Sequence, residues 1–243
     1  MNKFNLDTYS YSELKQLAMD MSIKIRRSKT ELIKDITTAF KEYEDYKRRK
    51  IDKYKKIGQL GEKGKEGITY LVQSKDQEYA MKTFRKMKSS KTLQKEAELQ
   101  NMAAEVGVSP KVIDVDTVSK YIVMEKLDRH LYEYLMKNNG VLSKNLQKQI
   151  VSIYRKLDKA GVFHADANLL NYMFKGKKLY IIDFGMAKEI TNSLIYKLGT
   201  NTPNLSIMTL GFILKLKELK TPPSSYSHLV TYLSDEQRSQ FNL

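Results

Sequence analysis

The sequence predicts an α+β fold of two lobes, preceded by a small helical module. Three observations predict it. Apolar residues near the start recur at helical spacing, short strand-like segments begin near residue 57, and a mostly helical half with one hairpin follows. With 243 residues, 41% of them hydrophobic, the chain is long enough to bury a substantial core.

The composition excludes several classes of protein. The chain has no cysteine, which excludes disulfides and thiolate metal sites. Its first residues lack the pattern of a signal peptide, and its apolar runs fall short of the about 20 residues that cross a bilayer. We therefore expect a soluble, cytoplasmic or nuclear protein without a membrane partner. The net charge of +15 favours anionic partners, although scattered lysines serve solubility equally well.

Residues 1–45 are predicted to form a pair of helices. Ser10 with Glu13, and Ser28 with Glu31, have the spacing of capping boxes. The connecting segment SIKIRRSK is basic. An apolar face follows each box and is expected to form one shared seam, made of Leu14, Leu17, Ala18, Met21, Leu32, Ile33, Ile36 and Phe40.

The remaining elements follow a run of charges over residues 46–56, which either continues the helix or links it to the next lobe. In chain order we expect strands over 67–73 and 77–84, a helix over 92–107, strands over 109–115 and 120–126, helices over 131–138 and 143–161, a hairpin of 172–174 and 178–183, and one last helix over 204–219 before a Pro-Pro break and a short tail.

Three polar residues flank the expected hairpin. Antiparallel pairing brings its two ends together, so Asn171 and Asp183 should converge. Their oxygens form a hard ligand pair that suits Mg²⁺. Asp166 lies five residues before Asn171, where it reaches the same place and remains free as a base.

The first strands carry a second group of candidate residues. Gly61, Gly64 and Gly67 let a backbone approach phosphates, although a surface turn has the same composition. Strand alternation places Ala80 and Lys82 on one face, with room for a flat ring beside the small residue.

A glutamate on the following helix is the expected partner of Lys82. Glu96 lies on the apolar face of that helix, where a carboxylate needs a counter-charge. Glu98 is the alternative, but it lies on a more polar face. A solvent-facing lysine is the simpler interpretation of Lys82 taken alone.

In this order, the parts resemble a protein kinase: a glycine segment, a strand lysine, a helix glutamate, a hinge, HADANLLN for H-X-D-X-X-X-X-N, and DFG. The resemblance covers about residues 57–188. It implies a bilobal protein kinase-like fold, with an N-lobe and linker helix over 46–126 and a reduced C-lobe over 127–243.

The resemblance also implies roles for single residues. Lys82 would hold ATP phosphates and be oriented by Glu96. Asp166 would accept or orient the substrate hydroxyl, with Asn168 beside the γ-phosphate. Mg²⁺ would be held by Asn171 and Asp183. The other nucleotide contacts that it implies are Gly61, Gly64 and Gly67 above the phosphates, and Ala80, Met124, Glu125, Leu127 and Met173 around adenine.

The chain departs from the usual kinase pattern at several places. Its glycine segment is G-X-X-G-X-X-G, Ala165 replaces the arginine of H-R-D, and Asn168 replaces a lysine. No A-P-E motif follows Gly185. In these respects the chain is similar to small atypical kinases, namely the RIO kinases, the kinase subunit of the KEOPS complex and the minimal kinases of large DNA viruses. The residue usage is typical of an AT-rich genome, such as that of a large DNA virus.

The helix pair resembles a SAP or Rho-N module, with Ser22 where glycine is typical. The alternative is a docking hairpin that braces the N-lobe. If the resemblance holds, DNA phosphates would be contacted by Lys24, Arg26, Arg27 and Lys29.

Three functions are compatible with these features. The first is an ATP-dependent Ser/Thr protein kinase, because every catalytic position is filled. The second is a nucleic-acid-associated pseudokinase that binds nucleotide as a scaffold. The third is a small-molecule kinase of the aminoglycoside-phosphotransferase type, which usually carries a larger helical substrate lobe than this chain has.

Overall fold

The computed structural model describes residues 5–21, 23–61, 64, 66–85 and 87–243, with the backbone alone described over 46–52. The chain divides into two compact units, Met1–Lys55 and Lys56–Leu243. No helix among the described residues is long and apolar enough to cross a membrane.

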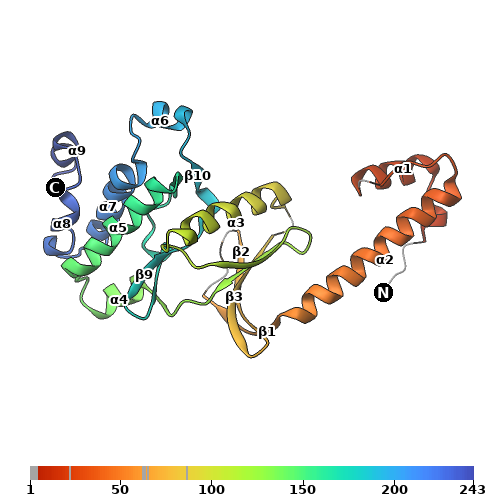
Figure 1. The fold of residues 1–243 in the computed structure, drawn as a ribbon, viewed down its shortest axis with the longest axis horizontal. Helices are drawn as coiled ribbons and strands as arrows, with labels where there is room; N and C mark the ends of the chain where they lie inside the picture. The colour runs from red at the N-terminus through yellow and green to blue at the C-terminus, as the bar shows by residue number, and fades with distance from the viewer. Residues whose placement is uncertain (1–4, 22, 62–63, 65, 86) are drawn as a thin grey trace. The chain divides into compact units, whose positions relative to one another are not determined.

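The first unit is a helical module with a core of its own. It consists of a short 3-10 turn (Leu6–Thr8), α1 (Tyr11–Asp20) and α2 (Lys29–Lys53) (Figure 1). The capping box predicted at Ser10 is present, with both of its hydrogen bonds. The predicted seam is confirmed by the buried residues Leu14, Ala18, Leu32 and Ile36, with Leu6 added to them.

Of the two alternatives for the charged run, the structure has the continued helix, since α2 extends to Lys53. One expectation about this unit is wrong. Phe40 was expected on the apolar seam but is 36% exposed. The α1 helix is only ten residues long, and the shared core ends at Ile36. Ser22 lies outside the described residues.

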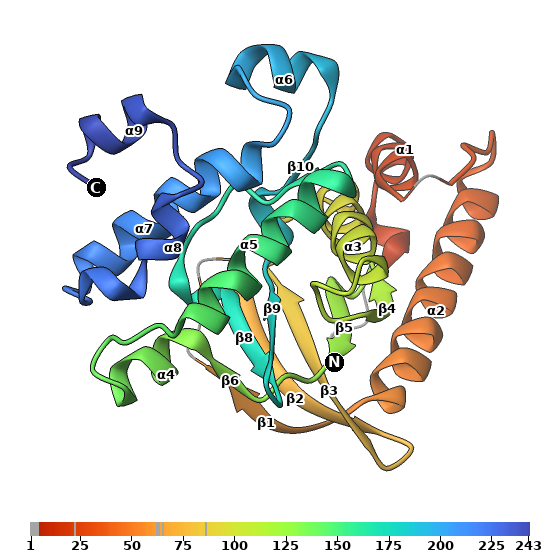
Figure 2. The same ribbon diagram turned by 60° about the vertical axis from the view of Figure 1, so that its left-hand side comes forward.

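The second unit begins with a five-stranded sheet in the order β1-β2-β3-β5-β4. Its central strands pair antiparallel, and Lys82 on β3 lies opposite both Thr69 on β2 and Ile122 on β5. The strands are β1 (Lys55–Leu60), β2 (Gly67–Ser74), β3 (Gln77–Phe84), β4 (Val112–Asp116) and β5 (Tyr121–Glu125). The helix α3 (Ser90–Glu105) follows β3 in the chain and lies beside β4 and β5 in space (Figure 2).

The rest of the unit is mainly helical, as predicted. The long α5 (Lys144–Lys159) passes over the β8–β9 hairpin (Figure 2), and its buried face includes Ile150 and Tyr154. The elements up to the hairpin are β6 (Arg129–His130), α4 (Leu131–Lys137), α5, β7 (Val162–Phe163), β8 (Tyr172–Lys175) and β9 (Lys178–Ile181).

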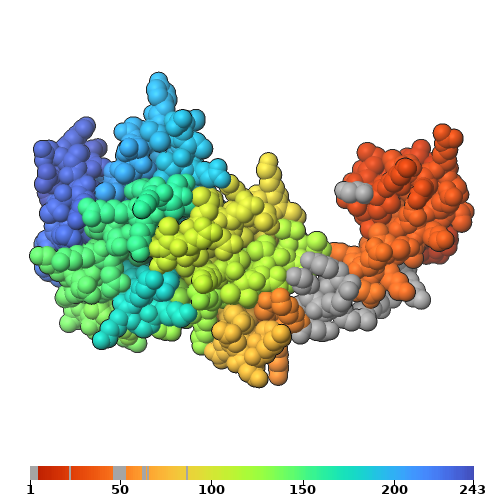
Figure 3. Space-filling view, in the orientation of Figure 1, coloured from red at the N-terminus to blue at the C-terminus, as the bar shows by residue number. Residues whose placement is uncertain are grey.

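The C-terminal part holds more helix than the single one expected. The expected helix is present as a π-helical turn (Asn204–Met208) that continues into α7 (Thr209–Glu218). Figure 3 shows the C-terminal segment in blue against the green surface of α5, and α5 contacts α8. The elements that were not expected are β10 (Lys188–Glu189), α6 (Asn192–Leu198), α8 (Ser227–Val230) and α9 (Asp235–Gln240).

Candidate active site

The β8–β9 hairpin brings together the two ends that flank it. Tyr172 pairs with Ile181, and the amide N–H of Ile182 donates to the carbonyl oxygen of Asn171 at 2.9 Å. Asn171 and Asp183 are therefore neighbours across the hairpin, as the sequence predicted. The Asn171 side chain is buried, and its Nδ2 lies 3.5 Å from the carbonyl oxygen of Asp166.

The segment before the hairpin presents the Asp166 carboxylate. Its Oδ1 accepts the amide N–H of Asn168 at 3.0 Å, which fixes the side chain in a tight turn. Asn168 is exposed, and its own Oδ1 accepts the amide N–H of Leu170 at 3.1 Å. Ala165 and Asp183 have left-handed backbones, with φ of 63° and 66°. Such backbone strain costs about 1–3 kcal/mol per residue and gathers at functional sites.

His164 connects this loop to the DFG segment. Its ring nitrogens lie 3.1 Å from the carbonyl oxygen of Asp166 and 2.9 Å from that of Ile182. The ring is fully buried and meets Phe184 edge-on at 4.9 Å. Burial lowers the pKa of His164, so the neutral ring is favoured at this position.

An asparagine that sequence analysis did not identify forms hydrogen bonds to the backbone of the same loop. The buried Asn204 accepts the amide N–H of His164 at 3.0 Å. Its Nδ2 donates to Asp158 Oδ1 and to the carbonyl oxygen of Val162, each at 2.7 Å. Asp158 also accepts backbone N–H groups from Asn204 and Leu205. The start of the π-helical turn before α7 thereby fixes the base of the loop that carries Asp166.

The ion pair predicted between Lys82 and Glu96 is present. Lys82 Nζ lies 2.8 Å from Glu96 Oε1 and 2.7 Å from Asp183 Oδ1. Burial alone would lower the pKa of Lys82, but the carboxylates of Asp183 and Glu96 outweigh it and raise the pKa. Burial would likewise raise the pKa of Asp183, yet the Lys82 ammonium holds it below its usual value. Glu98, the alternative partner, faces solvent and accepts from Gln94 at 3.3 Å.

Two further charges that sequence analysis did not identify lie beside this pair. Lys88 Nζ is 2.8 Å from Glu66 Oε2 and also contacts Glu96. Glu66 Oε2 lies 3.7 Å from Lys82 Nζ. The side chain of Lys88 is only 9% exposed, whereas that of Glu66 is 46% exposed. No spacing rule in the sequence distinguishes these two residues from their charged neighbours.

The three glycines of the expected phosphate segment have different surroundings. Gly61 has a φ of 71° and open space around it, and Gly64 is exposed. A Cβ on Gly67 would lie 1.9 Å from the carbonyl oxygen of Thr83. Close pairing of β2 with β3 therefore gives glycine at 67 a structural reason of its own. Residues 62, 63 and 65 of this segment lie outside the described residues.

The residues expected around adenine come from β3, β5 and β8. Ala80 is the register partner of Met124, whose side chain is buried. Beyond β5, the amide N–H of Asp128 donates to the carbonyl oxygen of Phe174 at 2.7 Å, which ties this stretch to β8. The other expected contacts lie on these same segments: Glu125, Leu127 and Met173.

The basic residues of the first unit are only partly free. Arg26 is paired with Asp35 at 2.7 Å, and Lys29 donates to the carbonyl oxygen of Asp7 at 3.2 Å. Lys24 and Arg27 are exposed.

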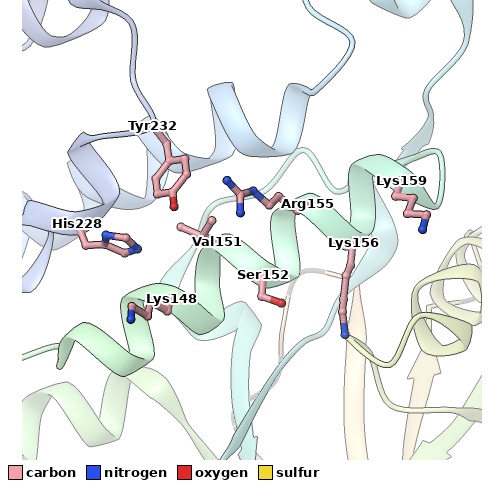
Figure 4. Close-up of a pocket in the computed structure, with 8 residues that line it drawn as sticks. All are labelled: Lys148, Val151, Ser152, Arg155, Lys156, Lys159, His228 and Tyr232. Carbon is pink, nitrogen blue, oxygen red and sulfur yellow. The ribbon is translucent and has the colours of Figure 1, made fainter.

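A separate pocket of about 420 Å³ lies on α5, away from the residues above (Figure 4). Its cations come from one face of α5, and Arg155 stacks over Tyr232 with 5.1 Å to the ring centroid. No acidic side chain is among its lining residues, which are Lys148, Val151, Ser152, Arg155, Lys156, Lys159, His228 and Tyr232.

Comparisons with known proteins agree with this geometry. The family model of the protein kinase domain matches residues 54–205, more than half of the chain. The KEOPS complex subunit Bud32 of Pyrococcus abyssi is 34% identical over 109 residues, which are 42% of this chain and 47% of that protein.

Two other archaeal proteins match this chain at nearly the same sequence identity. A probable serine/threonine-protein kinase BUD32 homolog of Archaeoglobus fulgidus is 32% identical over 93 residues, 38% of this chain and 44% of that protein. A probable bifunctional tRNA threonylcarbamoyladenosine biosynthesis protein of Methanocorpusculum labreanum is 33% identical over 86 residues, 35% of this chain and 15% of that protein. The chain thus spans less than half the length of each of these relatives.

Proposed function

This chain belongs to the protein kinase family, and on that premise we propose that it transfers the γ-phosphoryl group of ATP to serine or threonine hydroxyls of a protein. The observation that carries the proposal is the contact of Lys82 with both Glu96 and Asp183, at 2.8 and 2.7 Å. This arrangement joins the sheet, α3 and the DFG segment around one ammonium. It is the arrangement that a kinase needs in order to hold nucleotide phosphates.

The oxygen atoms near the hairpin fit Mg²⁺. Asn171 and Asp183 offer an amide oxygen and a carboxylate from adjacent positions, both of them hard ligands. When bound, Mg²⁺ neutralises charge on the phosphates. Asn171 and Asp183 would hold it, while Lys82 would bind the α- and β-phosphates.

In the transfer step, Asp166 orients the substrate hydroxyl and accepts its proton. The hydroxyl oxygen forms a bond to the γ-phosphorus as the bond from that phosphorus to the ADP oxygen breaks. The turn that fixes Asp166 uses only one of its carboxylate oxygens, which leaves the other for the substrate. Asn168 brings an amide rather than an ammonium to the γ-phosphate, so we expect slow transfer.

The test is incubation of the full chain with labelled ATP, Mg²⁺ and a mixture of basic and acidic proteins, followed by mapping of the phosphorylated residues. Wild type should label serine and threonine, and Asp166→Ala should not. Asp235→Ala is the matched control, because Asp235 is 96% exposed and lies on α9. The proposal fails if wild type transfers no more label than Asp166→Ala.

A second candidate function is phosphotransfer within an RNA-modifying assembly. It is favoured by the names of two relatives, a KEOPS subunit and a tRNA threonylcarbamoyladenosine biosynthesis protein, and by the basic pocket on α5. Lys148, Arg155 and Lys159 of that pocket form no ion pair within the described part of the chain. Phosphate contacts of this kind weaken steeply with salt.

Transfer RNA titration at several salt concentrations tests this candidate. A Lys148→Glu, Arg155→Glu double variant should lose most of the binding, whereas Lys215→Glu on α7 should not. Lys24 and Arg27 give a separate prediction of DNA contact by the first unit. Their replacement by Glu should abolish salt-dependent DNA binding if that prediction holds.

A further inference from the structure

Two lysines share one buried counter-charge at the candidate active site. Glu96 is 3% exposed and contacts Lys82 through Oε1 and Lys88 through Oε2. Both ammonium groups also lie over the ring of Phe84, with 5.0 Å to its centroid from Lys82 and 4.4 Å from Lys88. Lys88 therefore belongs to the same cluster as the strand lysine, although it lies beyond the end of β3.

One carboxylate cannot fully compensate two buried ammonium groups, because an ion removed from water needs a partner of its own. Lys82 has Asp183 as a second partner. The second partner of Lys88 is Glu66, at 2.8 Å, and Glu66 reaches Lys82 as well, at 3.7 Å. Carboxylate oxygens of Glu66, Glu96 and Asp183 all lie within 4.8 Å of one another, with the two lysines among them.

The Glu66 carboxylate differs from the other two in its position on the chain. It extends from the glycine segment and is 46% exposed, so a ligand can displace it without unfolding a helix or a strand. Its Oε2 lies 2.8 Å from where a Cβ on Gly185 would be, directly beside the DFG segment. A carboxylate between two ammonium groups has the charge and the acceptor atoms of a phosphate.

We propose that Lys82 and Lys88 together form a two-lysine subsite for the phosphate chain of a nucleotide, which the Glu66 carboxylate fills until the nucleotide displaces it. The inference rests on the proposed function, since it extends the same nucleotide site. Lys88 supplies a second cation near the phosphates, in a chain whose catalytic loop has Asn168 in place of the usual lysine.

The test measures binding of ATP, ADP and adenosine to the full chain by calorimetry in the presence of Mg²⁺. Lys88→Met should weaken ATP and ADP at least about tenfold, the loss expected for one hydrogen bond to a charged group. Adenosine carries no phosphate, so its affinity should not change. Lys88→Arg should recover most of the loss. Lys91→Met is the matched control, because Lys91 is exposed on α3 and should change nothing.

Glu66→Gln tests the second half of the inference. It removes the competing charge, so ATP should bind about two- to fivefold more tightly, the range expected of a half-exposed ion pair. Adenosine affinity should stay as in wild type. Glu105→Gln, an exposed change on α3, serves as the control.

Two results overturn the subsite. One is equal weakening of ATP and adenosine by Lys88→Met, which would mean a role in folding alone. The other is unchanged ATP binding in that variant. Failure of the proposed function alone gives a different result, because wild type would then transfer no phosphate although Lys88→Met still weakened ATP and left adenosine unchanged.

Discussion

Replacement of Asn204 by alanine is expected to loosen the catalytic loop and to destabilise the second unit. The Asn204 side chain is fully buried and makes three hydrogen bonds, one to Asp158 on α5 and two to the backbone of residues 162–164. Alanine removes all three and leaves the amide N–H of His164 and the carbonyl oxygen of Val162 buried without these partners. Asp158 keeps its backbone donors but loses one amide donor.

The magnitude follows from these bonds. A neutral hydrogen bond contributes about 1 kcal/mol net, and one to a charged group about 1.5–3 kcal/mol. Two neutral bonds and one to the Asp158 carboxylate, at 2.7 Å, therefore give a loss of about 3–5 kcal/mol. For a unit of this size, each kcal/mol lowers the melting temperature by about 2–4 °C, so the variant should melt roughly 10 °C lower.

The assay is thermal and urea unfolding of the full chain, followed by phosphate transfer well below the melting temperature. Transfer should fall as well, because His164 and Asp166 lose their fixed base. Asn201→Ala is the matched control, since Asn201 is exposed only three residues away. A loss below about 1 kcal/mol in Asn204→Ala would refute the reasoning, as would an equal loss in the control.

Three further changes test other parts of the structure. Glu96→Gln should lower kcat/KM by roughly 10- to 150-fold, because Lys82 loses its buried partner, while Glu98→Gln should not. Equal effects of the two changes would contradict the assignment of Glu96. Burial lowers the pKa of His164, so the neutral ring's contribution to the free energy of unfolding is complete above a pH of about 6.5. Below that pH the contribution is lost, by at most about 1.4 kcal/mol per pH unit. Urea unfolding should show this slope in wild type and not in His164→Asn. Leu32→Ala should lower the free energy of unfolding by about 2–5 kcal/mol and speed hydrogen exchange in α1 and α2. Phe40→Ala should lower it by under about 1 kcal/mol. Similar exchange rates in the two variants would contradict the burial assigned to Leu32.

The features that could be predicted from the sequence depend on residues that lie close together along the chain. The hairpin could be predicted because turn residues and strand alternation lie within a dozen positions of each other. Glu96 was identified as the partner of Lys82 because helical spacing placed it among Leu93, Leu99 and Ala103, all of which are buried. A charge on an apolar face is a strong signal, since burial without a partner is costly.

Three of the elements that were missed, β1, α6 and α9, contain no buried residue. Five of the six positions of β1 are exposed, so the strand shows no alternation and reads as part of the charged run before it. α6 and α9 contain no buried residue, and short helices without an apolar face leave no helical period in the sequence. Each helix begins with a side-chain cap, at Thr191 and at Ser234. Capping residues are common in loops as well, and therefore do not predict a helix alone.

The polar contacts that complete the candidate site are unpredictable for a different reason. Asp158 and Asn204 are 46 positions apart, and Glu66 and Lys88 are 22 apart. In a chain with 43 lysines and arginines, the type of residue at position 88 carries almost no information. Lys88 differs from the other lysines because it is buried beside Glu96, whose carboxylate already pairs with Lys82. That position depends on how β3 and α3 pack. Tertiary structure decides pairing of this kind. Lys88, the second cation that we propose near the phosphates, could therefore be identified only from the fold.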